Sequence, residues 1–281
     1  MAAANARPAF RVSTEYLCAA AGQRGRVSMS EEKKRCPWCS SDVLLIKYHD
    51  SEWGIPQHSD MVFFEHLLME SMSCGLSWLL MLRKRSVFSR CFDGFDYNRI
   101  ARYDESDVKR IMDDPDMIHS EPKIRAVINN ASRFLEIISE FGSFDKYIWS
   151  FTNGKTLLYE SFPAKRITRS AFSDAVSSDL KKRGFKFVGT VCIYSFLEAC
   201  GLINDHMPEC CRRAETLKMN DCLHVKDENE PLPTFPVRVQ RRKKSLGTPG
   251  IKQQNSVSAS APKRRRALSA EKTDCVRGRP Q

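Results

Sequence analysis

Four residues with metal-binding side chains occur as two pairs far apart in the 281-residue sequence. They are two cysteines and two histidines, Cys36, His49, His206 and Cys210. Two thiolates and two imidazoles satisfy the tetrahedral coordination that zinc prefers. Spacing alone leaves the ligand set open, because Cys39 completes a C-x-x-C motif and Cys211 lies next to the last of the four. Unrelated buried cysteines and surface histidines would explain the same pattern equally well.

A carboxylate and three aromatic side chains form a second group with potential for chemistry. Glu70 lies within an otherwise apolar stretch, FFEHLLMESMSCG, where a carboxylate is costly unless it is paired. A group of this kind is typical of functional sites. The aromatic residues are Tyr48, Trp53 and Trp78. Considered one at a time, a glutamate on the exposed edge of a helix and tryptophans in the core are the commoner outcomes.

Helical periodicity dominates the segments that must position these residues. In KIRAVINNASRFLEIISEFG, apolar residues recur at helical spacing and Gly142 follows the last of them. Asp104 precedes ESDVKRIM as a candidate N-cap, with Asp107 three residues further on. The stretch FFEHLLMESMSCGLSWLLMLRKR predicts a buried helix that breaks near Gly75, and Gly201 suits the end of a helix through TVCIYSFLEAC. The sequence has no run of alternating strands and no glycine-rich phosphate loop, so we predict an all-α fold.

Composition divides the chain into three parts. Residues 1–34 form a leader rich in arginine, alanine and serine, a composition shared by mitochondrial transit peptides and disordered leaders. Residues 35–212 carry the helical pattern and form the predicted domain. Residues 231–281 hold 13 basic and 2 acidic residues, which account for the whole net charge of +11. We expect residues 213–281 to be a disordered basic tail, because so polar a segment buries too little apolar surface to offset its ordering entropy.

Other features of the sequence bear on the compartment in which the protein works. Two basic clusters, at 241–244 and 263–266, are typical of nuclear import signals or of phosphate-binding arms. We expect a nuclear location if the source is eukaryotic, a mitochondrial one if the leader is a transit peptide, and otherwise the cytoplasm or nucleoid. No stretch approaches the roughly 18–20 apolar residues of a membrane span, which excludes an integral membrane protein. Eleven cysteines without a secretory signal indicate a reducing compartment.

Four blocks of sequence make the chain recognisable. They are RCPWCSSDVLLIKYHDSEWGIP, ESMSCGLSWLLMLRKR, KIRAVINNA and LKKRGFKFVGTVCIYSFLEACGLINDH. Their order and length resemble the type I 3-methyladenine-DNA glycosylase family over residues 35–212. The resemblance implies an all-α helix-hairpin-helix DNA glycosylase fold with two helical lobes. It also implies a zinc snap, a structural zinc ion that joins the two chain ends of the core.

Carried over position by position, the resemblance implies the functional residues of the chain. One zinc ion per chain would be bound by Cys36, His49, His206 and Cys210, and not by the rival cysteines. A base pocket would hold Glu70 as its catalytic residue and four substrate-binding residues, Tyr48, Trp53, Ser73 and Trp78. The expected partner is alkylated double-stranded DNA and the expected product is 3-methyladenine. We expect a monomer that does not contact membranes.

The implied activity is hydrolysis of the N-glycosidic bond of 3-methyladenine in alkylated DNA, a step of base excision repair. The base must first be extruded from the duplex into a pocket. Because N3-alkylated adenine is cationic, electron-rich rings can stack on it, and the carboxylate of Glu70 can accept a hydrogen bond and offset its charge. The alkylated base is already a good leaving group, so the pocket needs little acid catalysis. Water then captures the sugar and leaves an abasic site.

The sequence departs from the pattern of this family at three places. Ser73 stands where the family usually has glutamine, and Leu45 where it often has an aromatic residue. In the hairpin, DMIHSEPKI replaces a G-I-I-R-x-R-x-K-I pattern, so Asp116 and Glu121 would repel phosphate while Lys123 remains. The altered hairpin and the serine favour an alternative function, a non-catalytic or weakly active zinc-containing nucleic-acid-binding protein. The retained pocket residues favour the enzyme, and a purely structural zinc protein would have no reason to keep a pocket carboxylate.

Overall fold

The computed structural model of the protein describes residues 33–39, 42–160 and 166–232. The predicted leader lies almost entirely outside the described residues, as do the basic clusters at 241–244 and 263–266. Within the described ranges, no helix is long and apolar enough to cross a membrane.

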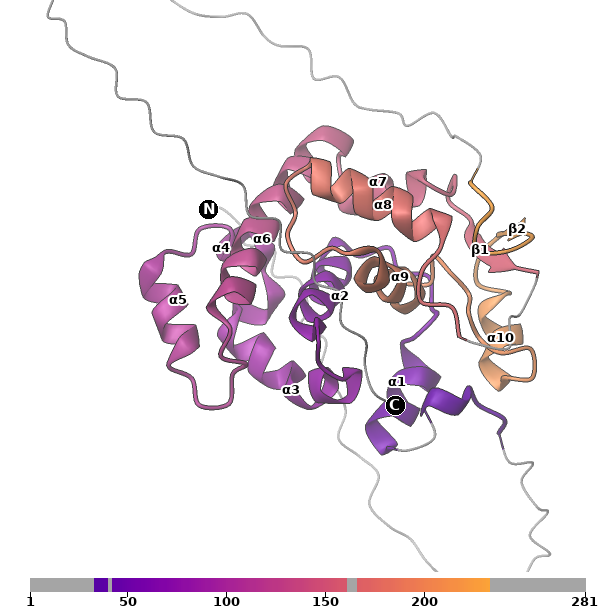
Figure 1. Ribbon diagram of the computed structural model, residues 1–281, viewed down its shortest axis with the longest axis horizontal. Coiled ribbons are helices and arrows are strands. Elements are labelled where there is room, and N and C mark those ends of the chain that lie inside the picture. Colours follow the sequence, from indigo (N-terminus) through magenta and orange to yellow (C-terminus); the bar gives the residue numbers. More distant parts are fainter. Residues whose placement is uncertain (1–32, 40–41, 161–165, 233–281) are drawn as a thin grey trace, which may run out of the picture. The chain divides into compact units, whose positions relative to one another are not determined.

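Helices form most of the described chain (Figure 1). They are α1 (Val43–Ser51), α2 (Asp60–Ser73), α3 (Trp78–Cys91), α4 (Tyr97–Ile100), α5 (Glu105–Met112), α6 (Glu121–Phe141), α7 (Phe144–Ser150), α8 (Ala171–Lys182), α9 (Thr190–Ala199) and α10 (Cys211–Thr216). Two short 3-10 helices, η1 (Pro37–Cys39) and η2 (Asp93–Phe95), precede α1 and α4. The strands are β1 (Thr156–Tyr159) and β2 (Cys222–Val225).

Several helix ends lie where the sequence predicts them. The Asp104 carboxylate caps α5 by accepting a hydrogen bond from the Ser106 N–H, while the Asp107 carboxylate accepts one from the Asp104 N–H. This reciprocal arrangement is a capping box. Gly142 ends α6 in the left-handed conformation, with a φ of 90°. The long apolar stretch divides into α2 and α3 at a turn where Gly75 has a φ of 79°.

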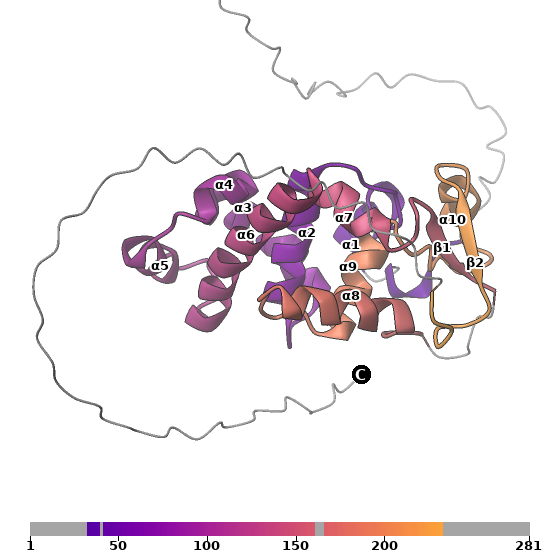
Figure 2. The same cartoon turned by 90° about the horizontal axis from the view of Figure 1, so that it is seen from above.

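Helix α2 is the centre of the fold and packs against α3, α6, α7 and α9 (Figure 2). Its residues Phe63, Phe64 and Leu67 are buried in one main apolar core with side chains from these helices. Contact on several sides explains why the sequence of α2 is apolar most of the way round. A smaller apolar cluster joins α1 and the turn after it to α9 and the start of α10, and consists of Cys36, Tyr48, Trp53, Ala199 and Cys210.

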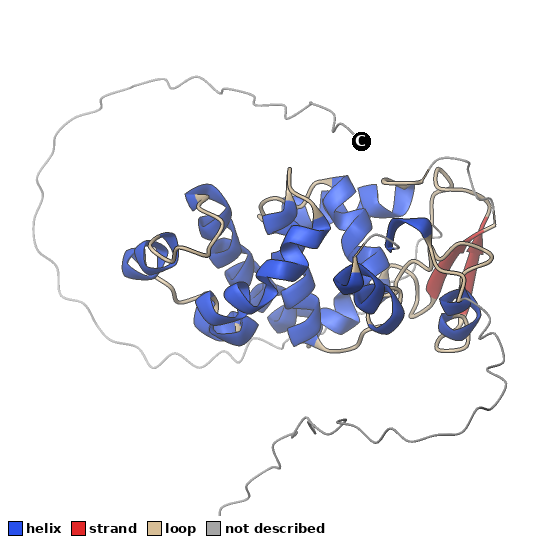
Figure 3. Cartoon of the chain, turned by 90° about the horizontal axis from the view of Figure 1, so that it is seen from below, coloured by secondary structure: helices blue, strands red, loops and turns tan. Residues whose placement is uncertain are grey.

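The described residues are mostly helical, as predicted, but they also contain two strands, and the folded region continues beyond residue 212. Strands β1 and β2 form a two-stranded parallel sheet in which Thr156 lies opposite Cys222 (Figure 3). Most of α10 and the whole of β2 lie beyond residue 212. Each strand has four residues, and β1 is buried along its whole length. Strands this short, paired between distant segments, leave no clear periodic pattern in the sequence.

Candidate metal centre and adjoining pocket

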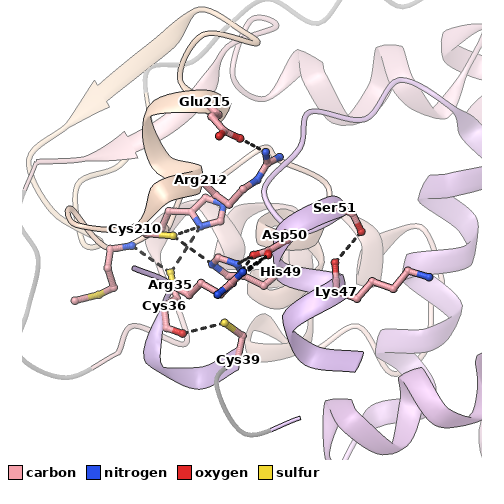
Figure 4. Close-up of polar contacts among 12 residues, drawn as sticks. Arg35, Cys36, Cys39, Lys47, His49, Asp50, Ser51, Cys210, Arg212 and Glu215 are labelled. Atoms are coloured by element: carbon pink, nitrogen blue, oxygen red, sulfur yellow. Dashed lines mark hydrogen bonds and ion pairs between the residues drawn. The ribbon is translucent and has the colours of Figure 1, made fainter. Parts of the chain in front are cut away.

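The two pairs of potential metal ligands lie together in the folded protein and form what we call the Cys–His cluster. Its members are Cys36, His49, His206 and Cys210. Their ligand atoms all lie within 4.8 Å of one another, and all four residues are buried. The Cys210 Sγ atom lies 3.3 Å from His49 Nε2 and 3.5 Å from His206 Nδ1. Figure 4 shows Cys36, His49 and Cys210 pointing toward one another from segments far apart in the chain.

Local structure explains how the four side chains meet. Cys36 directly precedes η1, and His49 lies in the last turn of α1. Cys210 is the N-cap of α10, so its side chain lies at the point where the chain turns into that helix. The rival Cys39 is not part of the cluster, and its Sγ donates a hydrogen bond to the Cys36 carbonyl oxygen at 3.1 Å. Cys211 is also outside the cluster, so the geometry groups Cys36 and Cys210, and not their neighbouring cysteines, with the two histidines.

A carboxylate outside the cluster orients one of its histidines. Asp50 Oδ1 lies 2.9 Å from His49 Nδ1, on the opposite side of the ring from the cysteine sulfur. Arg35 donates hydrogen bonds to both oxygens of Asp50, at 2.8 and 3.0 Å. The bond from Arg35, followed by that from His49, lowers the pKa of Asp50 to about 2. An ionised Asp50 favours the tautomer in which His49 Nδ1 carries the proton and Nε2 faces the sulfur atoms.

The chemistry of the Cys–His cluster fits a divalent metal ion. Burial raises the pKa of Cys36 and lowers that of His206 to about 3, so the protein alone holds a neutral thiol beside a neutral imidazole. Neutral imidazole is the form that binds metal, and a bound cation supplies the charge that stabilises a buried thiolate. Four protein ligands fill a tetrahedral coordination sphere, which fits a structural site.

A pocket lies beside this cluster and contains all five residues predicted for it. These residues are Tyr48, Trp53, Glu70, Ser73 and Trp78. Five further residues line the pocket, namely Trp38, Leu76, Arg166, Ser195 and Glu198. Sequence reasoning missed these five, although Glu198 could have been found, because it is the single carboxylate of the apolar helix α9.

Aromatic rings form one wall of the pocket and connect it to the Cys–His cluster. The rings of Trp38 and Trp53 are 5.0 Å apart, and those of Tyr48 and Trp78 are 5.4 Å apart. Trp53 also packs edge-on against His206, with ring centroids 4.5 Å apart. Among the described residues, the buried indole N–H groups of Trp38 and Trp78 have no hydrogen-bond partner. The pocket is therefore lined by aromatic rings, two of which belong to tryptophans whose indole N–H groups have no partner among the described residues.

Glu70 is buried, with 5% of its surface exposed, and not on an exposed edge of α2. The hydroxyl of Ser73 donates a hydrogen bond to the Glu70 carbonyl oxygen at 2.8 Å and lies 3.3 Å from the carboxylate oxygen Oε2. The serine at this position thus packs against the carboxylate and not across the pocket. Glu70 and Glu198 give the pocket two carboxyl groups. Burial raises the pKa of Glu198, and the charge of the adjoining Arg166 opposes this rise.

The lysine of the predicted hairpin stabilises the pocket from outside. Lys123, in the first turn of α6, donates hydrogen bonds to the carbonyl oxygens of Met72 and Cys74 at 2.9 and 2.6 Å. These bonds fix the end of α2, and burial lowers the pKa of Lys123. In the same region Arg125 pairs with Glu121, and Asp116 lies 3.9 Å from Arg90.

The site combines packed aromatic rings with two buried carboxyl groups, an arrangement that suits a class of protein binding a flat, electron-poor ligand. A family model described as methyladenine glycosylase matches residues 38–213. The chain belongs to the methyladenine glycosylase family, which confirms the resemblance seen in the sequence.

Proteins and structures similar to this chain agree with that assignment. DNA-3-methyladenine glycosylase 1 of Escherichia coli (strain K12) is 42% identical over 179 residues, which are 63% of this chain and 96% of that protein. DNA-3-methyladenine glycosylase of Haemophilus influenzae is 34% identical over 177 residues, covering 63% and 96% of the two chains. A crystal structure of 3-methyladenine DNA glycosylase I matches with a TM-score of 0.60 at 42% identity, over 63% of this chain and 98% of the other. The enzyme from Staphylococcus aureus, described for its recognition of 3-methyladenine, matches with a TM-score of 0.61 at 36% identity, over 64% and 96%.

Proposed function

We propose that this protein is a DNA-3-methyladenine glycosylase that acts on alkylated double-stranded DNA in base excision repair. The observation that carries the proposal is the buried carboxylate of Glu70 within a pocket walled by Tyr48, Trp53 and Trp78. A buried carboxylate favours a positively charged ligand, and N3-alkylated adenine is a flat cation of the kind that stacks on aromatic rings. A solved relative holds 3-methyladenine, which supports the same ligand class here.

The chemistry follows from what each residue can contribute. Extrusion of the nucleotide places the alkylated base against the aromatic rings that line the pocket, among them those of Tyr48 and Trp78. Glu70 accepts a hydrogen bond from the base edge and offsets its charge, while the indole N–H of Trp38 can donate to a ring nitrogen or a water molecule. The N-glycosidic bond then breaks, because its leaving group is a cationic base that departs as a neutral purine. Water adds to the sugar, and the products are free 3-methyladenine and an abasic site.

We further propose that the Cys–His cluster binds one structural zinc ion as a zinc snap. Soft thiolates with imidazoles are the ligands that zinc prefers, and the cluster joins segments from both ends of the folded region. Zinc would supply folding free energy and no catalytic step, because four protein ligands leave no open position. The helices on either side of α2 would then be the two lobes of a helix-hairpin-helix glycosylase, with the hairpin between α5 and α6.

The hairpin gives the alternative function specific support. Asp116 has an exposed side chain, and Lys123 is engaged with backbone oxygens of the α2–α3 segment. Neither arrangement favours a DNA phosphate. A non-catalytic or weakly active nucleic-acid-binding protein would therefore keep this fold and rely on the basic tail for DNA contact.

One pair of variants separates the two functions. In Glu70→Gln the pocket keeps its shape but loses the charge that balances the cationic base. Release of 3-methyladenine from methylated duplex DNA should fall at least 10-fold, while affinity for undamaged duplex stays within 2-fold of the wild type. The control is Glu65→Gln, which removes a carboxylate from the same helix outside the pocket. No release by the wild-type protein would support the alternative, and full release by Glu70→Gln would exclude the proposed role of the carboxylate.

We propose that the protein is a monomer and that the basic clusters at 241–244 and 263–266 direct it to the nucleus of a eukaryotic cell. The clusters have the composition of import signals, and the Arg-rich leader offers a mitochondrial address instead. Fusion of residues 231–281 to a fluorescent reporter tests the first address, since nuclear accumulation is expected. A diffuse reporter would oppose nuclear import and leave the leader to be tested in the same way.

A further inference from the structure

An arginine lines a pocket that we propose for a cation. Arg166 is one of the residues around the pocket, and its side chain is 50% exposed. A positive charge at this position opposes the entry of a cationic base, so the arginine needs a reason to be there. Because it lines the pocket and is also half exposed, it lies where the pocket meets solvent.

Contacts on its inner side hold the Arg166 guanidinium in place. Its Nη2 atom lies 3.3 Å from Oε2 and 3.5 Å from Oε1 of Glu198, whose side chain is 1% exposed. The guanidinium carbon also lies over the ring of Trp38, at 5.8 Å from its centroid. Within the described part of the chain, Nη2 is the one donor of Arg166 that makes a hydrogen bond. Glu198 thus holds one nitrogen of the guanidinium toward the interior, while half of the arginine side chain is exposed.

We propose that Arg166, positioned by Glu198, binds a phosphate next to the nucleotide that is extruded into the pocket. This inference rests on the proposed function. A base inside the pocket leaves its own flanking phosphates at the opening, where the half-exposed guanidinium lies. Arginine presents several donors in a planar fork that matches phosphate oxygens. The hairpin does not offer this contact, because Lys123 is engaged with carbonyl oxygens and Asp116 is acidic.

The contact should form only when a nucleotide is extruded, which distinguishes it from general attraction to DNA. Arg166→Ala should raise the concentration of methylated duplex DNA that gives half-maximal single-turnover release of 3-methyladenine, and leave the maximal rate within 2-fold. Loss of one phosphate contact lowers the slope of log affinity against log salt by about 0.9. The defect of Arg166→Ala should therefore shrink about 3.5-fold when salt rises from 50 to 200 mM.

Matched variants and probes make the result specific. Arg166→Lys should restore the salt slope, because a lysine also neutralises a phosphate. Arg169→Ala is the control, since Arg169 is an exposed arginine nearby in sequence that pairs with Asp174 and does not line the pocket. Binding of free 3-methyladenine and binding of undamaged duplex should be the same in Arg166→Ala as in the wild type.

Three results would overturn the inference. If the wild type releases base and Arg166→Ala keeps the wild-type salt slope, Arg166 binds no phosphate and the proposed function stands. If Arg166→Ala also loses affinity for free 3-methyladenine, the arginine acts by shaping the pocket. If the wild type releases no base, the proposed function fails and this inference fails with it.

Discussion

A zinc ion bound by the Cys–His cluster, as proposed above, would close a long loop in the folded region, and its removal should open that loop. The Cys–His cluster connects Cys36 to His206, which are 170 positions apart in the sequence. The loop-closure argument used for disulfides gives about 5 kcal/mol for a cross-link that closes a loop of that length. For a domain of 150–250 residues, each kcal/mol shifts the melting temperature by roughly 2–4 °C. A chelator strong enough to remove zinc should thus lower the melting temperature by roughly 10–20 °C.

The measurement combines metal analysis with calorimetry on the purified full chain. Cys36→Ser and Cys210→Ser should contain no stoichiometric zinc and should melt at the temperature of the chelated wild type. Cys39→Ser and Cys211→Ser are matched controls, because both cysteines are close in sequence to a ligand but lie outside the cluster. Both controls should keep one zinc ion per chain, although Cys39→Ser should also lose some stability because Cys39 is fully buried.

Two outcomes would refute this reasoning in different ways. Zinc retained in Cys36→Ser but lost from Cys39→Ser would show that the ligands are wrong. Stoichiometric zinc whose removal leaves the melting temperature unchanged would show that the ligands are right and that the loop is already closed by packing, through contacts such as that between Trp53 and His206.

Three further predictions follow from individual contacts. Asp50→Asn removes the carboxylate that orients His49 and should weaken zinc affinity about 10- to 100-fold. Competition with a chromogenic chelator measures this affinity. An unchanged affinity would show that the other members of the cluster are sufficient to orient His49. Burial lowers the pKa of His66 to about 3, so below about pH 6.5 the unfolded chain binds a proton that the folded protein does not bind. The free energy of unfolding should therefore fall by about 2 kcal/mol between pH 8 and pH 5 because of this residue. Urea denaturation of His66→Gln should show a smaller loss of stability over that range. Asp116→Gly removes an exposed negative charge from the hairpin, and a unit charge about 4 Å from a phosphate costs roughly 1 kcal/mol in water. The variant should therefore bind undamaged duplex DNA a few-fold more tightly, as measured by fluorescence anisotropy. An unchanged affinity would show that the hairpin lies away from the DNA.

Structural features that depend on neighbouring residues in the sequence could be predicted, and features that depend on contacts between distant segments could not. The capping box of Asp104 and Asp107 and the left-handed Gly142 each depend on neighbours within one helical turn. The strands β1 and β2 depend on each other across more than sixty residues, so neither four-residue segment shows its structure alone.

The candidate site divides in the same way. Spacing predicted which residue types could bind a metal, but the choice of Cys36 and Cys210 over their neighbours needed either the family resemblance or the folded geometry. Glu70 was singled out because a carboxylate in an apolar helix is costly. The same reasoning applies to Glu198 in α9, whereas its pairing with Arg166, 32 positions away, leaves no pattern in the sequence.

The order of the pocket-lining residues along the chain has a consequence for synthesis of the protein in the cell. Trp38, Tyr48 and Trp53 emerge early from the ribosome, whereas Ser195 and Glu198 emerge only after most of the domain has been made. The last member of the Cys–His cluster, Cys210, follows them. A nascent chain or a fragment that stops before these residues therefore presents aromatic side chains without the rest of the pocket lining. Such a product should be a client of chaperones and not a partial enzyme, so base recognition arises in a single late step of translation.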